Sequence, residues 1–273
     1  MDKKTLILTL TRLDKDIADS TAREVTRKAT ILAYNRQNPH DQYFEKEAYY
    51  PVSAEAKARF DKFATVKVDL SRIKQITNYN EPVLLTGETG TGKELLAQAL
   101  HGDRTGKFVT VNCAAMTESL LDSELFGHVK GAFTGADSNN VGLFGTARDG
   151  TVFVDELCAA SKQLQTRLLR IIEYQTFRPV GASIESRTNS RVVFATSGNI
   201  ATLLPDLLGR IPFNFHIPPL RDRLEDIDEI LDQIDIEHTF PRDFKWESHM
   251  LPYNVRSLKR AVIHYRFYEE LPK

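Results

Sequence analysis

Between residues 80 and 200, short apolar runs alternate with longer amphipathic stretches. The apolar runs, which have the length of buried strands, are residues 83–86, 108–112, 152–154 and 192–196. The stretches with apolar residues at helical spacing are 93–101 and 162–174. Short apolar strands separated by helices predict an α/β fold, with a parallel sheet covered by helices on both faces.

The two ends of the chain lack this alternation. Residues 1–60 mix a strand-like run with a charged, surface-helix pattern, and we expect a helical linker or docking element there. A sensor domain is the alternative, disfavoured because the segment is too short to enclose a ligand pocket. The α/β subdomain is expected at 61–219. After Pro218-Pro219 no strand pattern remains, and 220–273 is expected to form a short helical lid, with helices at 224–234 and 257–268.

Composition and charge narrow the class of protein. The chain has 273 residues, 41% of them hydrophobic and 27% charged, as in ordinary globular domains. The formal net charge is −1, so no global attraction to nucleic acid or to a membrane is expected. No apolar run reaches the roughly 18–20 residues of a membrane span, and the polar start has no signal-peptide core. We expect a soluble, cytoplasmic protein with Cys113 and Cys158 as buried free thiols.

A glycine-rich segment after the first apolar run carries the strongest chemical signal. It reads Gly87-Glu88-Thr89-Gly90-Thr91-Gly92-Lys93-Glu94. Strand, glycine loop and helix is the context of a phosphate-binding loop (Walker A), whose backbone N–H groups surround a polyphosphate while Lys93 reaches the β- and γ-phosphates. A plain glycine turn is the alternative, disfavoured by the complete spacing. Glu94 replaces the usual Ser or Thr that binds Mg²⁺, so the metal needs a protein ligand elsewhere.

Two adjacent carboxylates follow the third apolar run. Successive strand residues point to opposite sides, so Asp155 and Glu156 can do different jobs. Alone, the pair would indicate a solvated turn, but downstream of a phosphate loop it is typical of a Walker B segment. Asp155, with Glu156 beside it, is expected to hold Mg²⁺, and Glu156 to polarise the attacking water. The expected cofactors are therefore ATP and Mg²⁺.

The segment between these motifs matches a known family. Residues 124–136 read Glu-Leu-Phe-Gly-His-Val-Lys-Gly-Ala-Phe-Thr-Gly-Ala, which closely resembles the signature of bacterial enhancer-binding proteins. These are AAA+ ATPases that activate the sigma-54 form of RNA polymerase. The hexapeptide that is rare outside them is Gly131-Ala132-Phe133-Thr134-Gly135-Ala136. The resemblance runs from about Glu81 to Asn254 and implies the AAA+ P-loop fold.

The resemblance implies that the hexapeptide tips a loop that touches sigma-54. Phe133 between small residues, with Gly131 and Gly135 as hinges, suits a contact that forms and dissociates, because burying one Phe is worth about 1.5–3 kcal/mol. The residues alone leave open a Phe in the core with the glycines forming a turn. Residues 183–190 match the position of the family's second partner-facing loop.

The resemblance also assigns three residues around the nucleotide. Asn112 aligns with the residue that pairs with the catalytic glutamate, here Glu156, although a local cap is its alternative. Arg256 aligns with the second sensor, with a helix cap as the alternative. Arg210 aligns with an arginine that enters the neighbouring subunit's site, with a solvated surface arginine as the alternative. The catalytic residues implied are Lys93, Glu156 and Arg210.

Three positions depart from the family pattern. Ser197 stands in place of the sensor Asn and has a shorter arm with a single hydroxyl. Leu204 stands in place of the first of two arginines, and an arginine finger in trans can be worth about three to five orders of magnitude in rate. The lid motif at 251–258 lies in a shorter lid than the family's, and no basic reading helix with a partner helix follows Arg256. We therefore expect no DNA-binding element in this chain.

Together these features predict an ATPase that assembles into a ring, expected to be a hexamer, and drives the Phe133 loop against the sigma-54 subunit of RNA polymerase to activate transcription. The alternative is an ATP-gated regulator that binds sigma-54 with weak or no hydrolysis, given Ser197 and Leu204. A generic AAA+ remodeller of another client would require the hexapeptide to be a coincidence.

Overall fold

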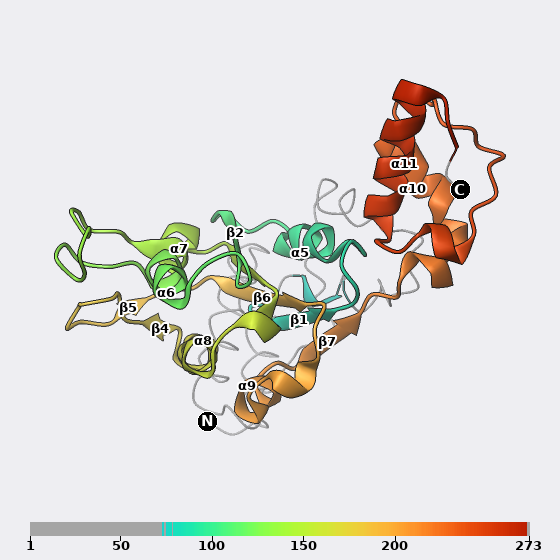
Figure 1. Ribbon diagram of the computed structural model, residues 1–273. Helices are drawn as coiled ribbons and strands as arrows, with labels where there is room; N and C mark the ends of the chain where they lie inside the picture. The colour runs from blue at the N-terminus through green and yellow to red at the C-terminus, as the bar shows by residue number, and fades with distance from the viewer. Residues whose placement is uncertain (1–72, 74, 78, 272–273) are drawn as a thin grey trace, which may run out of the picture. The chain divides into compact units, whose positions relative to one another are not determined.

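A five-stranded parallel sheet forms the centre of the α/β part. The structure, a computed structural model, describes residues 73, 75–77 and 79–271, so the segment expected at 1–60 lies outside the described residues. The strand order is β2-β3-β6-β1-β7 (Figure 1). The strands are β1 (Val83–Thr86), β2 (Phe108–Asn112), β3 (Thr151–Asp155), β6 (Arg191–Thr196) and β7 (Phe213–His216). The predicted parallel sheet is confirmed, because every pairing within it is parallel.

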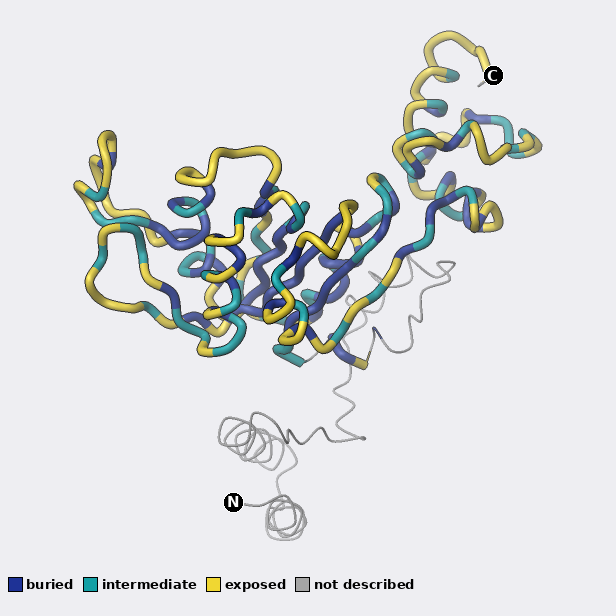
Figure 2. The backbone as a smooth tube through the Cα atoms, turned by 60° about the horizontal axis from the view of Figure 1, so that its bottom comes forward, coloured by how far each residue is buried: buried dark blue, intermediate teal, exposed yellow. Residues whose placement is uncertain are grey.

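Alternate residues of each strand are buried on opposite faces, so helices cover both sides of the sheet. Leu84, Val152 and Phe194 pack on one face, which is covered by α6 (Glu118–Phe126), α7 (Gly142–Ala147), α8 (Lys162–Tyr174) and α9 (Pro205–Gly209). Val83, Phe153 and Val193 pack on the other face, beneath α5 (Lys93–His101). Figure 2 shows the strands as the buried centre of this part.

The helix α8 illustrates why these segments fold as they do. Leu164, Leu168 and Ile171 are spaced by four and three residues, so they form one buried stripe on the sheet. Ser161 caps the helix by accepting a hydrogen bond from the Leu164 N–H. The observed bounds of α8 and α5 equal the predicted ranges 162–174 and 93–101.

Two strand elements were not predicted. The edge strand β7 reads Phe-Asn-Phe-His and alternates half-buried with exposed residues, so it contains no apolar run. The pair β4 (Thr176–Phe177) and β5 (Ser186–Arg187) forms a short antiparallel hairpin. Its turn contains part of the segment 183–190 that the resemblance assigns to a second partner-facing loop.

Residues 220–268 pack around a core of their own. Its buried residues are Leu220, Ile227, Leu231, Phe240, Leu251, Leu258 and Val262. They come largely from α10 (Ile227–Ile234) and α11 (Val255–Tyr268) and the segment between them. A short 3-10 turn precedes α10, and α11 begins two residues before the expected start at 257. Within the described residues, no helix has the length and apolar character needed to cross a membrane.

Candidate functional site

Three neighbouring parallel strands end at one edge of the sheet, and each is followed by residues of the candidate site. The glycine loop follows β1, Asp155 and Glu156 lie at the end of β3, and Ser197 follows β6. Because β6 pairs with both β1 and β3, the three segments converge at this edge. Ligands of open parallel sheets bind beyond the carboxyl ends of the strands.

The loop backbone requires glycine at two points of close approach. Gly87 and Gly90 have φ angles of +146° and +81°. A Cβ atom on Gly87 would lie 2.5 Å from the carbonyl oxygen of Ile217, and one on Gly90 would lie 2.4 Å from that of Tyr253. Any larger residue would collide with backbone, so the loop is tightly enclosed between the end of β7 and the start of α11.

Lys93 is the first residue of α5, and its side chain turns back over the loop. Its Nζ donates hydrogen bonds to the carbonyl oxygens of Gly87 at 2.8 Å and Glu88 at 3.0 Å. Burial lowers the pKa of Lys93, while Asp155 and Glu156 act in the opposite direction. The ammonium therefore lies within electrostatic range of both carboxylates, as a lysine that grips a metal-bound triphosphate must.

The chain turns sharply where the carboxylates leave β3. The Glu156 N–H donates to Asp155 Oδ1 at 2.9 Å, and Glu156 has φ 51° and ψ 46°, a left-handed conformation that few non-glycine residues adopt. Burial raises the pKa of Asp155, and the neighbouring charge of Glu156 also raises it. A bound cation would favour the ionised form of Asp155.

The donor set at this edge fits Mg²⁺ in a nucleotide complex. Within the described part of the chain no cluster of three or more His, Cys, Asp and Glu residues could hold a metal by itself. Mg²⁺ commonly uses one or two carboxylates and takes its other ligands from water and substrate phosphates. Glu94 is exposed, and the Thr91 hydroxyl donates to the Glu88 carbonyl at 2.8 Å. Asp155 is thus the best-placed protein ligand.

Ser197 and not Asn112 contacts the carboxylate of Glu156. The Ser197 hydroxyl lies 2.7 and 2.9 Å from the two carboxylate oxygens, and the Ser197 N–H donates at 3.2 Å. Asn112 Oδ1 accepts the Ala114 N–H at 2.8 Å, as a local cap does. The expected pairing of Asn112 with Glu156 is therefore replaced in this structure by a contact from the sensor position.

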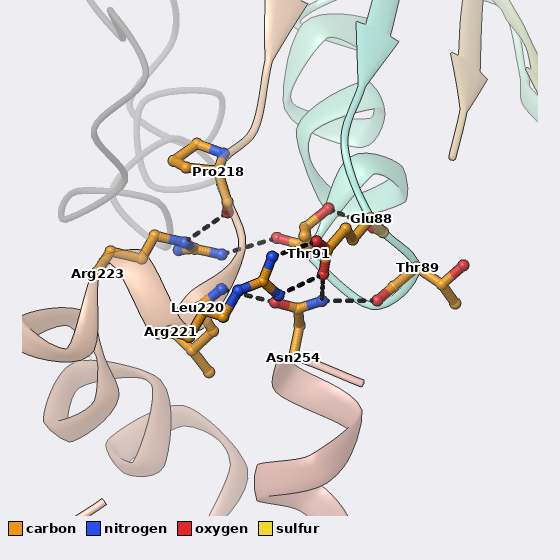
Figure 3. Close-up of polar contacts among 8 residues, drawn as sticks. All are labelled: Glu88, Thr89, Thr91, Pro218, Leu220, Arg221, Arg223 and Asn254. Atoms are coloured by element: carbon orange, nitrogen blue, oxygen red, sulfur yellow. Dashed lines mark hydrogen bonds and ion pairs between the residues drawn. The ribbon is translucent and has the colours of Figure 1, made fainter. Parts of the chain in front are cut away.

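The lid is attached to the phosphate-binding loop by several polar contacts (Figure 3). Arg221 forms two hydrogen bonds with the Glu88 carboxylate, at 2.8 and 2.5 Å. The amide of Asn254 donates to the Thr89 carbonyl at 3.0 Å and accepts the Leu220 N–H at 2.6 Å. These contacts join the loop, the segment after β7 and the start of α11.

Two further arginines of this region lie near the loop. Buried Arg223 donates to the Thr91 carbonyl at 3.0 Å and pairs with Asp226 at 2.9 Å. Arg256 lies in the first turn of α11 with an exposed side chain, and its charge contributes to lowering the pKa of Lys93 after the larger effect of burial. The structure therefore brings Arg256, expected as the second sensor, to the electrostatic neighbourhood of Lys93.

The hexapeptide forms a tight exposed turn in the loop between α6 and α7. The turn is closed by hydrogen bonds from Gly131 N–H to the Ala136 carbonyl and from Ala136 N–H to the Phe133 carbonyl. Phe133 is 45% exposed and meets the His128 ring edge-on at 5.0 Å, so it does not belong to the core. Thr134, Gly131 and Gly135 are exposed and Ala136 is buried.

The β4–β5 hairpin supports this loop from beside it. The Val129 N–H donates to the Val180 carbonyl at 3.1 Å. A Cβ on Gly181 would lie 2.8 Å from the Cβ of Ala132, so the two segments are in direct contact. Figure 1 shows both extending from the same side of the sheet. The hexapeptide loop therefore lies against the turn of the hairpin, which also contains the first residues of the segment 183–190.

Arg210 lies far from the candidate nucleotide site of its own chain. It follows α9 and precedes β7, whereas the phosphate-binding loop follows β1, the parallel neighbour of β7. The two therefore lie at opposite ends of these strands. Its guanidinium pairs with Glu173 of α8 at 2.8 Å and is 47% exposed. Arg210 therefore contributes nothing to the site within one subunit.

The sequence interpretation missed the pair formed by Arg221 and Glu88 and the role of Asn254. Arg221 was visible only as part of the matched segment 218–223, and no local signal shows which carboxylate it meets.

Comparison with known proteins places this geometry in context. The model of the sigma-54 interaction domain family matches residues 61–208. The Psp operon transcriptional activator of Escherichia coli K12 is 45% identical over 168 residues, which cover 58% of this chain and 52% of that protein. The regulatory protein LuxO of Vibrio parahaemolyticus is 34% identical over 267 residues, covering 89% of this chain and 55% of that protein. The chain thus spans about half the length of these two relatives.

A solved structure supports the same fold. NtrX from Brucella abortus, crystallised in complex with ADP, superimposes with a TM-score of 0.63 at 24% identity, over 90% of this chain and 55% of that one. At this identity the likeness concerns the fold, which is the AAA+ arrangement of a parallel sheet flanked by helices.

Proposed function

The chain belongs to the family of sigma-54 interaction domains found in transcriptional activators, and we propose that it hydrolyses ATP to remodel the sigma-54 RNA polymerase complex. The proposed reaction is transfer of the γ-phosphoryl group of ATP to water, giving ADP and phosphate. The proposed output is a force that the Phe133 loop exerts on sigma-54.

Within the proposed mechanism, the residues at the sheet edge divide the work. The amides of the loop 87–92 and the ammonium of Lys93 bind the phosphates, with the N-terminus of α5 beside them. Bound Mg²⁺ would neutralise charge on the β- and γ-phosphates, and Asp155 would hold it. Glu156 would orient the attacking water and accept its proton. Arg256 would sense the γ-phosphate from the lid.

The observation that carries this proposal is the position of Lys93 relative to the two carboxylates. The pKa of Lys93 responds first to its burial and then to Asp155 and Glu156, which follow a different strand. Its ammonium is held by two carbonyl oxygens of the loop and lies within electrostatic range of two adjacent carboxylates that follow another strand. This is the charge arrangement that a metal–triphosphate complex requires. The ADP complex of NtrX, which has the same fold, adds support for nucleotide binding.

Ring assembly completes the proposed active site. Arg210 lies at the opposite end of the strands from the phosphate-binding loop of its own chain, so it could act only in a neighbouring subunit. On assembly, Arg210 would leave its ion pair with Glu173 and contact the γ-phosphate bound by the neighbouring subunit. We propose a closed ring, with six subunits, in which each site borrows Arg210 from the next.

A second candidate function is an ATP-gated regulator that binds sigma-54 but turns over poorly. Two observations favour it: Ser197 occupies the sensor position, and Leu204 removes one of two arginines. The steady-state ATPase rate of the purified chain, compared with Glu156→Gln, separates the two functions. Turnover well above that of Glu156→Gln supports the enzyme, and turnover equal to it supports the regulator.

Binding to sigma-54 is tested separately from turnover. The chain would be mixed with purified sigma-54 in the presence of ADP and aluminium fluoride, which mimic the transition state. Co-elution on gel filtration that depends on the trap supports the proposed partner. Absence of a complex, with an assembled ring visible by mass, would exclude sigma-54 as the target of the loop.

A further inference from the structure

We propose that Ser197 is the residue that positions Glu156 for hydrolysis, in the place that the resemblance assigns to Asn112. This inference rests on the proposed ATPase function and names one more residue of the same site. It follows from three features of the region where β3 and β6 end.

The first feature is the completeness of the contact. Both donors of Ser197, its hydroxyl and its backbone N–H, are directed to one carboxylate. The hydroxyl is 2.7 and 2.9 Å from the two oxygens of Glu156, so either oxygen can accept its hydrogen bond. Hydrogen bonds to an ionised acceptor are among the stronger ones in proteins, so this contact fixes the orientation of the side chain.

The second feature is the backbone of Glu156. Its left-handed conformation is unfavourable for a residue with a side chain and persists only where surrounding contacts hold it. The Asp155 carboxylate holds the Glu156 N–H, and Ser197 holds the carboxylate. The two contacts fix opposite ends of the residue, which is how a general base is kept at a defined distance from bound substrate.

The third feature is the rigidity of the turn that carries Ser197. The Gly198 N–H donates to the Thr196 hydroxyl at 3.0 Å, and a Cβ on Gly198 would lie 3.1 Å from Cys158 Cβ. Thr196 itself is buried at the end of the central strand β6. The serine on this turn therefore reaches Glu156 from the neighbouring strand.

Asn112 is engaged elsewhere in this structure. It lies at the end of β2, on the far side of β3 from β6, and its side-chain oxygen is held by the Ala114 N–H. Glu156 thus receives its hydrogen bonds from the β6 side of the sheet. In this chain, the serine that replaces the sensor asparagine is also the residue that pairs with the catalytic glutamate.

The test measures steady-state ATP hydrolysis by the full chain carrying Ser197→Ala, Ser197→Thr or Thr202→Ala. Ser197→Ala is expected to lower kcat by about tenfold with little change in KM for ATP, since a misdirected base affects the chemical step. Ser197→Thr keeps the hydroxyl and is expected to recover most of kcat. Thr202→Ala is the matched control, because its hydroxyl donates to the Asn199 carbonyl in the same loop and does not touch Glu156.

A double substitution distinguishes positioning from a structural effect. In the Glu156→Gln background, Ser197→Ala is expected to cause no further loss, because the group that it positions is already disabled. A further loss there, equal to that in the wild type, would show a structural role and overturn the inference. Asn112→Ala is expected to reduce kcat less than Ser197→Ala, and the reverse order would also overturn it.

Failure of the inference can be told apart from failure of the proposed function. Wild-type turnover well above that of Glu156→Gln, with kcat of Ser197→Ala unchanged or raised, leaves the ATPase standing and removes the role of Ser197. Wild-type turnover equal to that of Glu156→Gln removes both. A rise in KM alone would assign Ser197 to nucleotide binding and would overturn the positioning role.

Discussion

The guanidinium of Arg221 holds the carboxylate of Glu88 through two hydrogen bonds, one to each oxygen. The two residues belong to different parts of the chain, since Glu88 lies in the phosphate-binding loop and Arg221 lies at the start of the lid. The hydrogen bond from Arg221 is also the largest influence that lowers the pKa of Glu88. A carboxylate beside a phosphate site would repel its ligand, and Arg221 compensates that charge.

This charge balance predicts opposite results for the two partners. Arg221→Gln removes the cationic partner of the Glu88 carboxylate, which among the described residues keeps only the Asn254 amide as a donor, and is expected to weaken ATP binding by about tenfold. Glu88→Gln leaves an unpaired arginine there and should not weaken binding. Titration with a fluorescent ATP analogue measures both, with Arg260→Gln on the exposed face of α11 as the control for loss of a lid charge. Equal weakening by both substitutions would mean that the pair acts through shape, not charge.

The exposed position of Phe133 predicts a selective loss of partner binding. Its ring is nearly half exposed and rests on His128 alone among aromatic neighbours in the described chain, so truncation should disturb little of the fold. Phe133→Ala is expected to weaken trapped binding to sigma-54 by about 10- to 100-fold, the equivalent of one buried phenyl group. Val141→Ala, at an exposed apolar residue near the end of the same loop, is the control. Equal loss with both would indicate general apolar contact and not a specific tip.

The separation of Arg210 from its own loop predicts complementation between subunits. Arg210→Ala is expected to lower ATP turnover by about a thousandfold. Mixing it with Glu156→Gln should restore part of the rate, because the second variant supplies the arginine that the first lacks. A mixture of Arg210→Ala with the double variant Glu156→Gln/Arg210→Ala is the matched control and should remain inactive. A mixture of the two single variants that stays inactive would argue that Arg210 does not act in trans.

Local sequence patterns were sufficient to predict the bounds of the strands and helices that contain clear apolar runs or stripes. The bounds of β1, β2, α5 and α8 equal those predicted, because each combines a clear hydrophobic period with a turn or cap at its ends. The edge strand β7 was missed because its half-exposed Phe-Asn-Phe-His lacks such a run.

The site was predictable as far as its motifs, but not in its contacts across the chain. Lys93, Asp155 and Glu156 follow from strand-end positions, whose convergence is dictated by the parallel sheet. The contact of Ser197 with Glu156 depends on the register of β3 against β6, and the bond of Arg221 to Glu88 joins residues 133 positions apart. The register of the strands and the position of the lid depend on packing between distant segments, which no local pattern in a single sequence reveals.

The lid offers a test of stability that is independent of nucleotide. Trp246 is the chain's single tryptophan and stacks on Phe240 with ring centroids 5.4 Å apart, so its fluorescence reports on the lid core. Buried Asp235 accepts hydrogen bonds from the Phe240 N–H and the Thr239 hydroxyl, each at 2.8 Å. Burial alone would raise the pKa of Asp235, but these hydrogen bonds outweigh it and hold the pKa below its ordinary value.

The direction of this shift fixes the pH dependence. Because the folded pKa is lower than the unfolded one, the ionised carboxylate stabilises the lid above the unfolded pKa, and that contribution is lost as the pH falls through the folded pKa. Asp235→Asn is therefore expected to lower the unfolding free energy followed by Trp246 at pH 7 by about 1–3 kcal/mol. The difference from wild type should shrink below about pH 4. Asp232→Asn, at an exposed carboxylate paired with Arg242, is the control and should have little effect. A difference that grows in acid would contradict the assigned direction, since it would require Asp235 to be protonated more readily in the folded lid than in the unfolded chain.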